Sequence, residues 1–478
     1  MRPTSVLRRS CATLLIALCA GLGLCLAQTT FQRIYKTAGE AWADAVQQTL
    51  DGGYIIVGYN NSSSTGYHAD VYMVKVDPSG DIQWTKTYGG SDSDYGRSVR
   101  QTSDGGYVIV GETYSFGAGR GDVYLIKTDS AGNPLWTRTY GSAQAEEGTS
   151  MELTPDGGYI IVGSTFSFVS NHADVYLIRT NPLGDSLWTR TYGGPSSTWG
   201  TSIQITSDGG YVFVANTISS GIYLVRTDSA GDTLWTRELG GPTTAMSVQQ
   251  TSNGGYIITG STPTPSEVDV YLLKTDPSGD TVWTKTYGSG SGSSVQQTSD
   301  GGYIVAGSTF STLFHLSNAY LLKTNSSGDT LWTRTFGGSQ YNLQGRSVQQ
   351  TSDGGYIIAG PAQGSERGIF LVKTQAEGLV LSVQNDPSVV PMAFGLEQNY
   401  PNPFNPSTTI RYALPHRSHV TLTVFSILGQ QITTLVNGDI DAGYHTVQFD
   451  GSELASGVDL YRMQAGNFVQ TRKLLLVR

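Results

Sequence analysis

Three aromatic residues, Trp42, Tyr95 and Trp199, occupy one equivalent position of a repeated segment and are candidates for contacting a ligand. Exposed indole and phenol rings can stack on sugar rings or hold the side chains of a bound peptide. Glu147 takes the same position in another copy of the segment. The alternative is that these rings pack between neighbouring loops. We assign Trp42, Tyr95 and Trp199 as candidate ligand-binding residues on loops.

Two further positions carry polar residues in every copy of the segment. One holds mostly glutamine, which predicts a solvated wall if it faces a central channel: Gln47, Arg100, Glu152, Gln204, Gln249, Gln296 and Gln349. The other is always basic: Lys75, Lys127, Arg179, Arg226, Lys274, Lys323 and Lys373. A basic residue in every copy indicates a structural role, and we expect its stem to cover apolar neighbours while its charge reaches solvent.

Residue types that bind metals are present, but their spacing favours structural roles. His68-Ala69-Asp70 and His172-Ala173-Asp174 recur in separate copies, too far apart to share one ion, so each Asp is expected to cap the start of a strand. Asp77 and Asp81 fit a glycine-containing hairpin turn better than a calcium loop. No nucleophile elbow, phosphate-binding loop or zinc helix interrupts the segments. We assign no catalytic residue, no metal and no cofactor.

The elements that position these residues come from an internal repeat of about 50 residues between 28 and 381. Its marker is Gly-Gly-Tyr after Asp or Asn, and the marker starts at residues 51, 104, 156, 208, 253, 300 and 353. Each copy contains four short apolar runs rich in β-branched and aromatic residues and bounded by turn residues. The repeat therefore predicts four strands per copy, with tight hairpin turns after the first and third strands and variable loops elsewhere.

The last copy lacks the tryptophan that opens the fourth strand in the other six. A matching segment, Phe31-Gln32-Arg33-Ile34-Tyr35, stands alone before the first copy. We expect this N-terminal strand to complete the last sheet. The chain then forms a closed seven-bladed β-propeller, which leaves no long open sheet edge.

The repeated Thr-Asp-x-x-Gly-x-x-Leu-Trp pattern resembles the tryptophan-docking repeat of quinoprotein-like propellers, over residues 28–381. The resemblance implies that the first strand of each copy is innermost, that the fourth is outermost, and that the variable loops form the functional face. It does not imply the quinone cofactor, because those dehydrogenases generally have eight blades and often a vicinal disulfide.

The ends of the chain bear on its location. Residues 1–27 have the basic start, apolar run and small-residue end of a signal peptide, and all three cysteines, Cys11, Cys19 and Cys25, lie within it. Without this segment 26 basic residues face 38 acidic ones, a net charge near −12. Such a charge disfavours nucleic acid and anionic membranes as partners. No later stretch is long and apolar enough to be a transmembrane segment.

After a linker at residues 382–394, the sequence changes to alternating strands typical of a small Ig-like β-sandwich at 395–478. This domain resembles the type A C-terminal sorting domain of the type IX secretion system. The matching residues include Asn399, Tyr400, Pro401, Asn402, Pro403, Phe404, Asn405, Pro406, Gly429, Gly457, Lys473 and Arg478. Asp459 departs from the tyrosine that is usual there.

The resemblance implies export through the periplasm and outer membrane by the type IX machinery, to the cell surface or the medium. We expect an all-β, monomeric surface protein that binds a glycan or protein through its variable-loop face. Two alternatives stay open: a secreted polysaccharide hydrolase or lyase on the same face, and a structural surface-layer component.

Overall fold

The computed structural model describes residues 30–37, 39–61, 68–166, 172–194, 196–218, 221–240, 243–265, 267–311, 316–337, 341–364, 367–380, 394–396, 398–399, 402 and 404–477. The predicted signal peptide, nearly all of the predicted linker, and Tyr400, Pro401, Pro403 and Arg478 lie outside these residues. The described chain is all-β. Within it, no helix has the length and hydrophobicity that a membrane crossing requires.

Each repeat forms one antiparallel sheet whose strands are ordered as they occur in the chain. Six sheets have four strands: β2 (Glu40–Gln48), β3 (Tyr54–Asn61), β4 (Asp70–Val76) and β5 (Ile82–Tyr88); β6 (Asp94–Gln101), β7 (Tyr107–Thr113), β8 (Asp122–Thr128) and β9 (Pro134–Tyr140); β10 (Glu146–Leu153), β11 (Tyr159–Thr165), β12 (Asp174–Thr180) and β13 (Ser186–Tyr192); β14 (Thr198–Ile205), β15 (Tyr211–Thr217), β16 (Gly221–Thr227) and β17 (Thr233–Leu239); β18 (Thr244–Gln250), β19 (Tyr256–Pro263), β20 (Val268–Thr275) and β21 (Thr281–Ser289); β22 (Ser291–Gln297), β23 (Tyr303–Ser311), β24 (Leu316–Thr324) and β25 (Thr330–Phe336).

The seventh sheet combines both ends of the repeat region. It contains β26 (Tyr341–Leu343), β27 (Ser347–Gln350), β28 (Tyr356–Gly364), β29 (Gly368–Thr374) and the N-terminal strand β1 (Phe31–Lys36). β1 pairs antiparallel with β29, with Phe31 opposite Lys373 and Lys36 opposite Gly368. The predicted pairing of the N-terminal strand with the last repeat is confirmed.

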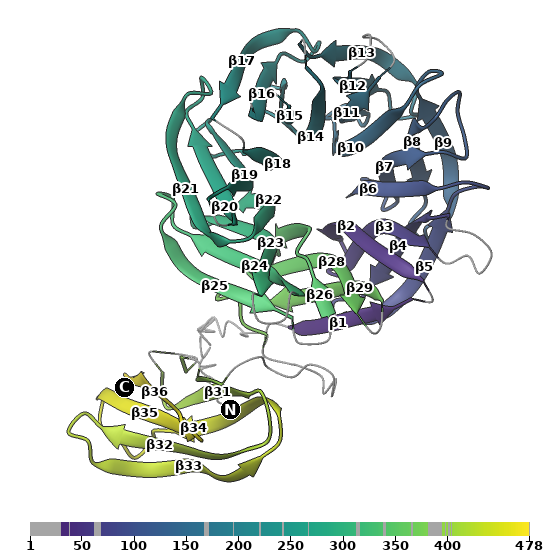
Figure 1. The fold of residues 1–478 in the computed structure, drawn as a ribbon. Coiled ribbons are helices and arrows are strands. Elements are labelled where there is room, and N and C mark those ends of the chain that lie inside the picture. The colour runs from purple at the N-terminus through teal and green to yellow at the C-terminus, as the bar shows by residue number, and fades with distance from the viewer. Residues whose placement is uncertain are drawn as a thin grey trace, which may run out of the picture.

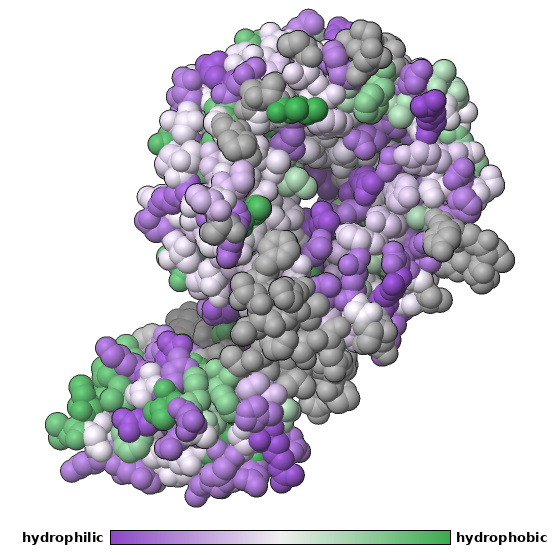
Figure 2. Space-filling model, viewed as in Figure 1, coloured by the Kyte–Doolittle hydropathy of each residue, from purple (hydrophilic) through white to green (hydrophobic). Residues whose placement is uncertain are grey.

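The sheets stand radially around an open centre, which is the arrangement of a β-propeller (Figure 1). The first strand of each sheet lies innermost, and we call β2, β6, β10, β14, β18, β22, β26 and β27 the inner strands. The fourth strand lies outermost. In Figure 2 hydrophilic residues gather around the hollow at the centre of the ring.

The core lies between neighbouring sheets rather than along the ring axis. Met73 of β4 and Ile109 of β7, for example, belong to one buried cluster that joins the first two sheets. The middle strands are covered on both faces, and all seven residues of β7 and of β8 are buried. This explains why the middle strands have continuous apolar sequences instead of alternating ones.

An aromatic residue of each outer strand docks on the next sheet. Trp84 of β5 lies beneath Gly132, whose φ is +75°, and a Cβ added to Gly132 would lie 2.8 Å from the indole. Tyr88 donates its hydroxyl to the Gly132 carbonyl oxygen at 2.7 Å. Only glycine fits here because the turn needs a positive φ and the indole leaves no space.

The basic residue of every third strand is buried, so the expectation that its charge reaches solvent is wrong. Lys75 is 3% exposed, and its Nζ donates to Asp51 at 2.9 Å and to the Val76 carbonyl oxygen at 3.0 Å. Asp51 also accepts from the Gly53 amide at 3.0 Å. The cation thus ties the third strand to the hairpin turn between the first two strands. Burial is tolerated because the charge is paired and hydrogen-bonded.

The C-terminal region forms two sheets with a shared core. One contains β30 (Gly395–Leu396), β31 (Ser407–Leu414) and β34 (Gly443–Asp450); the other contains β32 (Ser418–Ser426), β33 (Gln431–Ile440), β35 (Gly457–Ala465) and β36 (Phe468–Leu476). Ile410 of the first sheet meets Leu422 and Met463 of the second in one buried cluster. Phe394, predicted to be linker, stacks on Phe468 with ring centroids 5.6 Å apart.

Candidate functional site

The candidate residues Trp42, Tyr95 and Trp199 lie in inner strands, not in loops as expected. Each is the second or third residue of its strand, at the end of the channel where the inner strands begin; we call this end the channel mouth. The equivalent residues of the seven sheets, here called the mouth positions, are Trp42, Tyr95, Glu147, Trp199, Thr244, Ser291 and Gln344. They differ far more between repeats than the hairpin turns do. All three candidate side chains are half-buried.

Trp42 and Tyr95 belong to a ladder of aromatic rings that crosses the first two sheets. Trp42 stacks on Tyr59, its cross-strand neighbour, with centroids 5.9 Å apart and planes 12° apart. Tyr59 meets the edge of Tyr95 at 4.8 Å, and Tyr95 meets Tyr114 at 6.4 Å. Much of the ring surface of Trp42 and Tyr95 is therefore occupied by the protein itself, as the packing alternative predicts.

Trp199 is separate from this ladder. It lies opposite Asn216 of β15, whose amide is engaged with the backbone of Ala245 at 2.7 and 2.9 Å. Among the described residues no aromatic ring or cation contacts its indole. Of the three candidates, Trp199 is therefore the one whose ring no neighbouring aromatic residue covers in the described chain.

A β-bulge follows the mouth position in the first six sheets and changes the direction of one side chain. In the first two sheets the register shifts at Asp44 and Arg97, so neither residue has a partner on the second strand. The corresponding residues in the third and fourth sheets, Thr149 and Thr201, donate to carbonyl oxygens of the next sheet, Gly200 at 2.8 Å and Ala245 at 3.1 Å. Bulges re-aim side chains. Here the bulges direct Asp44 and Arg97 to the mouth, and Arg346 takes the equivalent position in the seventh sheet.

Arg97 is the centre of a half-buried ion-pair network. Its guanidinium binds Asp44 at 3.2 Å and Glu112 at 2.8 Å, and its Cζ lies 5.3 Å from the Tyr95 centroid. Burial raises the pKa of Asp44 despite the opposing effect of Arg97 and Arg346. Burial, reinforced by the Glu112 charge, also raises the pKa of Glu147. The mouth therefore combines aromatic rings, two guanidinium groups and three carboxyl groups, of which Asp44 and Glu147 have raised pKa values.

The signal that could have found Asp44, Arg97, Glu112 and Arg346 was their departure from otherwise similar repeats. Sequence reasoning missed them because the bulge that brings them to the mouth is a property of strand pairing.

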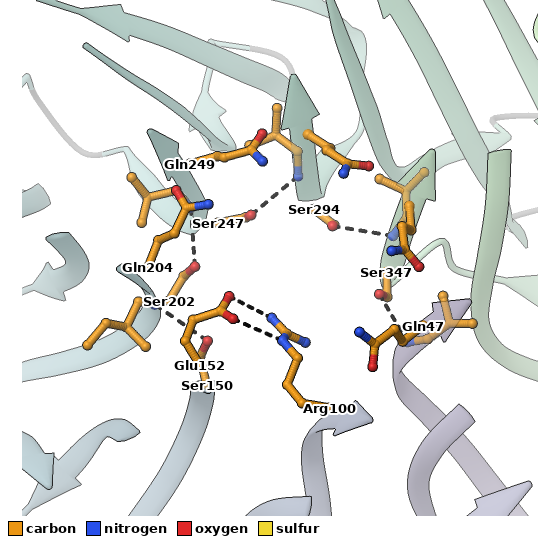
Figure 3. A pocket seen from close by; sticks show the side chains of 17 residues that line it. Gln47, Arg100, Ser150, Glu152, Ser202, Gln204, Ser247, Gln249, Ser294 and Ser347 are labelled. Carbon is orange, nitrogen blue, oxygen red and sulfur yellow. Dashed lines mark hydrogen bonds and ion pairs between the residues drawn. The ribbon is translucent and has the colours of Figure 1, made fainter. Parts of the chain in front are cut away.

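Glutamine and serine side chains farther along the inner strands line a channel cavity of about 260 Å³, and most of them link neighbouring sheets by hydrogen bonds (Figure 3). The Oε1 of Gln47 accepts from the Gln101 amide at 2.7 Å, and the Oγ of Ser202 accepts from the Val248 amide at 3.2 Å. Glutamines of four other sheets make the same bond: Gln204, Gln249, Gln296 and Gln349. The expected solvated wall thus has a bonding role as well.

Arg100 and Glu152 replace glutamine in the second and third sheets. They form a bidentate pair, with Nε to Oε2 at 3.1 Å and Nη2 to Oε1 at 2.8 Å. Figure 3 shows the two side chains directed toward each other across one side of the channel. Because both charges are paired, this site has little capacity to bind a charged ligand. In the described ranges, no three His, Cys, Asp or Glu residues lie where they could hold a metal ion.

The described residues of the sorting signal form structural contacts in the C-terminal region. Asn399 is 2% exposed, and its backbone N–H donates to the Tyr461 hydroxyl at 2.7 Å. Asn402 accepts from the Leu475 amide at 2.8 Å, and Phe404 exchanges backbone hydrogen bonds with the last strand. The other described residues of the set are Asn405, Pro406, Gly429, Gly457 and Lys473; Gly429 takes a φ of +82° in a turn.

Comparisons with known proteins identify the two regions separately. The family model described as "Secretion system C-terminal sorting domain" matches residues 398–477. The model described as "Outer membrane protein assembly factor BamB", a PQQ-like repeat family, matches residues 68–262. The sorting domain indicates export by the type IX secretion system to the cell surface or the extracellular space.

One curated relative and several solved structures are distantly similar. The regulatory protein FlaEY of Caulobacter vibrioides is 29% identical over 128 residues, which are 23% of this chain and only 13% of that protein. Sqt1 from Chaetomium thermophilum is 12% identical (73% of this chain, 88% of that chain, TM-score 0.41). The β-propeller domain of the Trilobed protease from Pyrococcus furiosus is 10% identical (74% of this chain, 100% of that chain, TM-score 0.42). Similarities this distant have no bearing on function.

Proposed function

We propose that this exported chain is a surface binding protein, a closed seven-bladed propeller that binds a glycan or protein ligand at its channel mouth. In this proposal the C-terminal region is an Ig-like sandwich that serves as the export address. The propeller holds the binding residues on paired strands, where their positions are better defined than on loops.

The observation that carries the proposal is the loss of repeat symmetry at the mouth. The mouth positions of the first four sheets carry large or charged side chains, whereas the fifth and sixth carry Thr244 and Ser291. The opposite end of the ring has nearly identical turns, in which Asp77, Asp129 and Asp276 make the same backbone contacts. A single ligand needs an asymmetric site, and only the mouth offers one among these two ends.

The experiment is a binding screen with a matched variant pair. The chain without its signal peptide is tested on immobilised glycans and on surface proteins, together with Trp199→Ala at the mouth and Asn133→Ala in a turn. We expect a ligand whose binding weakens about 10- to 100-fold in the Trp199 variant and is unchanged in the Asn133 variant. Loss in the turn variant alone, or in neither, contradicts the proposal.

Cleavage of a polysaccharide, by a hydrolase or a lyase reaction, is the second candidate function. It is favoured by Glu147, a half-buried carboxyl group at the mouth whose pKa is raised by burial, the direction that favours a proton donor. Product release from a polysaccharide panel, abolished by Glu147→Gln, would establish this activity. Binding without turnover would support the binding function instead.

A further inference from the structure

Arg346 is a cation at the channel mouth that has no hydrogen-bond acceptor in the described part of the chain. Its Nε is buried and unpartnered. Its guanidinium carbon lies 5.6 Å from the centroid of the Trp42 ring. A buried donor without an acceptor is destabilising, so a ligand that supplied an acceptor would gain affinity from the new hydrogen bond.

Arg97 shows what a satisfied guanidinium looks like at the same position of another sheet. It binds two carboxylates, Asp44 and Glu112, at 3.2 and 2.8 Å. Asp44 is close enough to Arg346 for each charge to affect the other, but its carboxylate is already bonded to Arg97. Arg346 is therefore the basic group at the mouth that retains free donors.

The backbone around Arg346 is held from two sides. Its amide donates to the Ala359 carbonyl oxygen at 2.9 Å, and the Gly345 amide donates to Gly307 of the neighbouring sheet at 2.9 Å. The Trp42 ring restricts the side chain further. An anion that reaches Arg346 meets a group already positioned, which lowers the entropic cost of binding.

We propose that Arg346 binds a carboxylate of the ligand, and that this ligand is a glycan containing isolated acidic sugars. The inference rests on the proposed binding function and names its ligand class. The planar guanidinium fork matches a carboxylate. A densely charged polyanion is disfavoured because Asp44 lies close to Arg346, Glu112 and Glu147 add negative charge to the same mouth, and the whole chain has a net charge of −9.

The test uses acidic saccharides and their neutral counterparts: sialyllactose with lactose, and digalacturonate with its methyl ester. Binding is measured by calorimetry for the wild type, Arg346→Gln and Arg346→Lys. Arg190→Gln removes the same charge from the outer strand β13, where Arg190 approaches Asp232 only to 3.9 Å, and is the matched control. Thermal denaturation of each variant verifies that it is folded.

We expect at least 10-fold tighter binding of the acidic member of one pair, an effect that Arg346→Gln abolishes, Arg346→Lys weakens and Arg190→Gln leaves unchanged. Equal binding of acidic and neutral saccharides at the mouth would overturn this inference and leave the proposed function standing. Tighter binding of a peptide carboxylate than of any saccharide would also overturn it. Absence of binding to every saccharide, peptide and surface protein would reject both.

Discussion

The hydroxyl of Tyr35 donates a hydrogen bond to the carbonyl oxygen of Gly80 across 2.7 Å. It joins the N-terminal strand to the turn that precedes β5, and the bond matches the one between Tyr88 and Gly132 at the next junction. Phe31 packs against Gly80 where tryptophan stands in other outer strands, and Arg33 pairs with Asp81 at 3.3 Å. β1 therefore completes the seventh sheet and also docks that sheet on the first.

Removing residues 28–36 should destabilise the whole ring, because the deletion exposes β29 and breaks the junction with the first sheet. We expect a large fall in the midpoint of a single cooperative denaturation transition. Tyr35→Phe, which removes only the hydrogen bond, should cost about 1 kcal/mol. A deletion variant that melts with the parent and stays monomeric would show that the N-terminal strand is dispensable.

Asn253→Asp should stabilise the fifth sheet. There Lys274 is buried opposite Asn253 instead of the aspartate found in the other six sheets, and burial lowers its pKa to about 8. A carboxylate would pair with this cation and stabilise the protein by about 1–3 kcal/mol at pH 7. In the wild type Lys274 loses its proton at a lower pH in the folded protein than in the unfolded chain. Stability should therefore rise between pH 8 and the unfolded value of 10.5.

Urea denaturation of both proteins at pH 7 and pH 10 measures this effect. The advantage of the variant should shrink at the higher pH, since the wild type no longer buries a charge there. Asp300→Asn, the reverse exchange in the sixth sheet, should destabilise. A constant or growing difference would mean that the charge of Lys274 is not the cause.

Acid should weaken the turns that the buried cations hold. Burial acts to raise the pKa values of Asp104 and Asp300. Hydrogen bonds from Lys127 and Lys323, from a threonine hydroxyl and from a glycine amide, together with the lysine charges, outweigh burial and lower both pKa values to about 2. Their stabilisation is complete above the unfolded value of 3.8 and is lost as the pH falls through 2. The melting temperature of the double variant Asp104→Asn/Asp300→Asn should fall less between pH 4 and pH 2 than that of the wild type. Equal slopes would refute the assignment.

Trp42→Ala should mainly lower the stability of the protein, whereas Trp199→Ala should mainly weaken ligand binding. Trp42 stacks on Tyr59 and lies beside Arg346, so its removal should cost about 2–4 kcal/mol of stability. Trp199 has no ring or cation partner in the described chain, so its removal should change stability little and ligand binding more. Chemical denaturation and a binding assay on the same samples compare the two. A more destabilising Trp199 variant would reverse the roles given to these rings.

The propeller should fold without the C-terminal region, since each has its own buried core. A contact between them, from Arg411 to the Val380 carbonyl oxygen, is small by comparison. Residues 28–385 expressed alone should give a soluble protein with an unchanged melting transition. Aggregation of this fragment, with the longer chain soluble, would show that the boundary is misplaced.

The repeat by itself determined the strands, the hairpin turns and the partner of the N-terminal strand. These features follow from local patterns: short β-branched runs, Asp-Gly-Gly turns, and a Phe31–Tyr35 segment that matches the outer strands. A match of that kind identifies the partner because hydrogen-bonded pairing repeats in every sheet. The sorting domain could likewise be recognised from its motifs.

Only the tertiary structure decided the state of the basic residues and the composition of the mouth. Lys75 resembles a solvated lysine in sequence, but its neighbours across the sheet and in the turn enclose it. The sequence predicts that Trp42 and Tyr95 lie in loops. In the structure they lie in strands, and Tyr59 packs between them. The bulges at Asp44 and Arg97 bring charges together from separate repeats. Burial and proximity arise from how sheets pack around the ring, and residues about 50 positions apart carry no local pattern that records it.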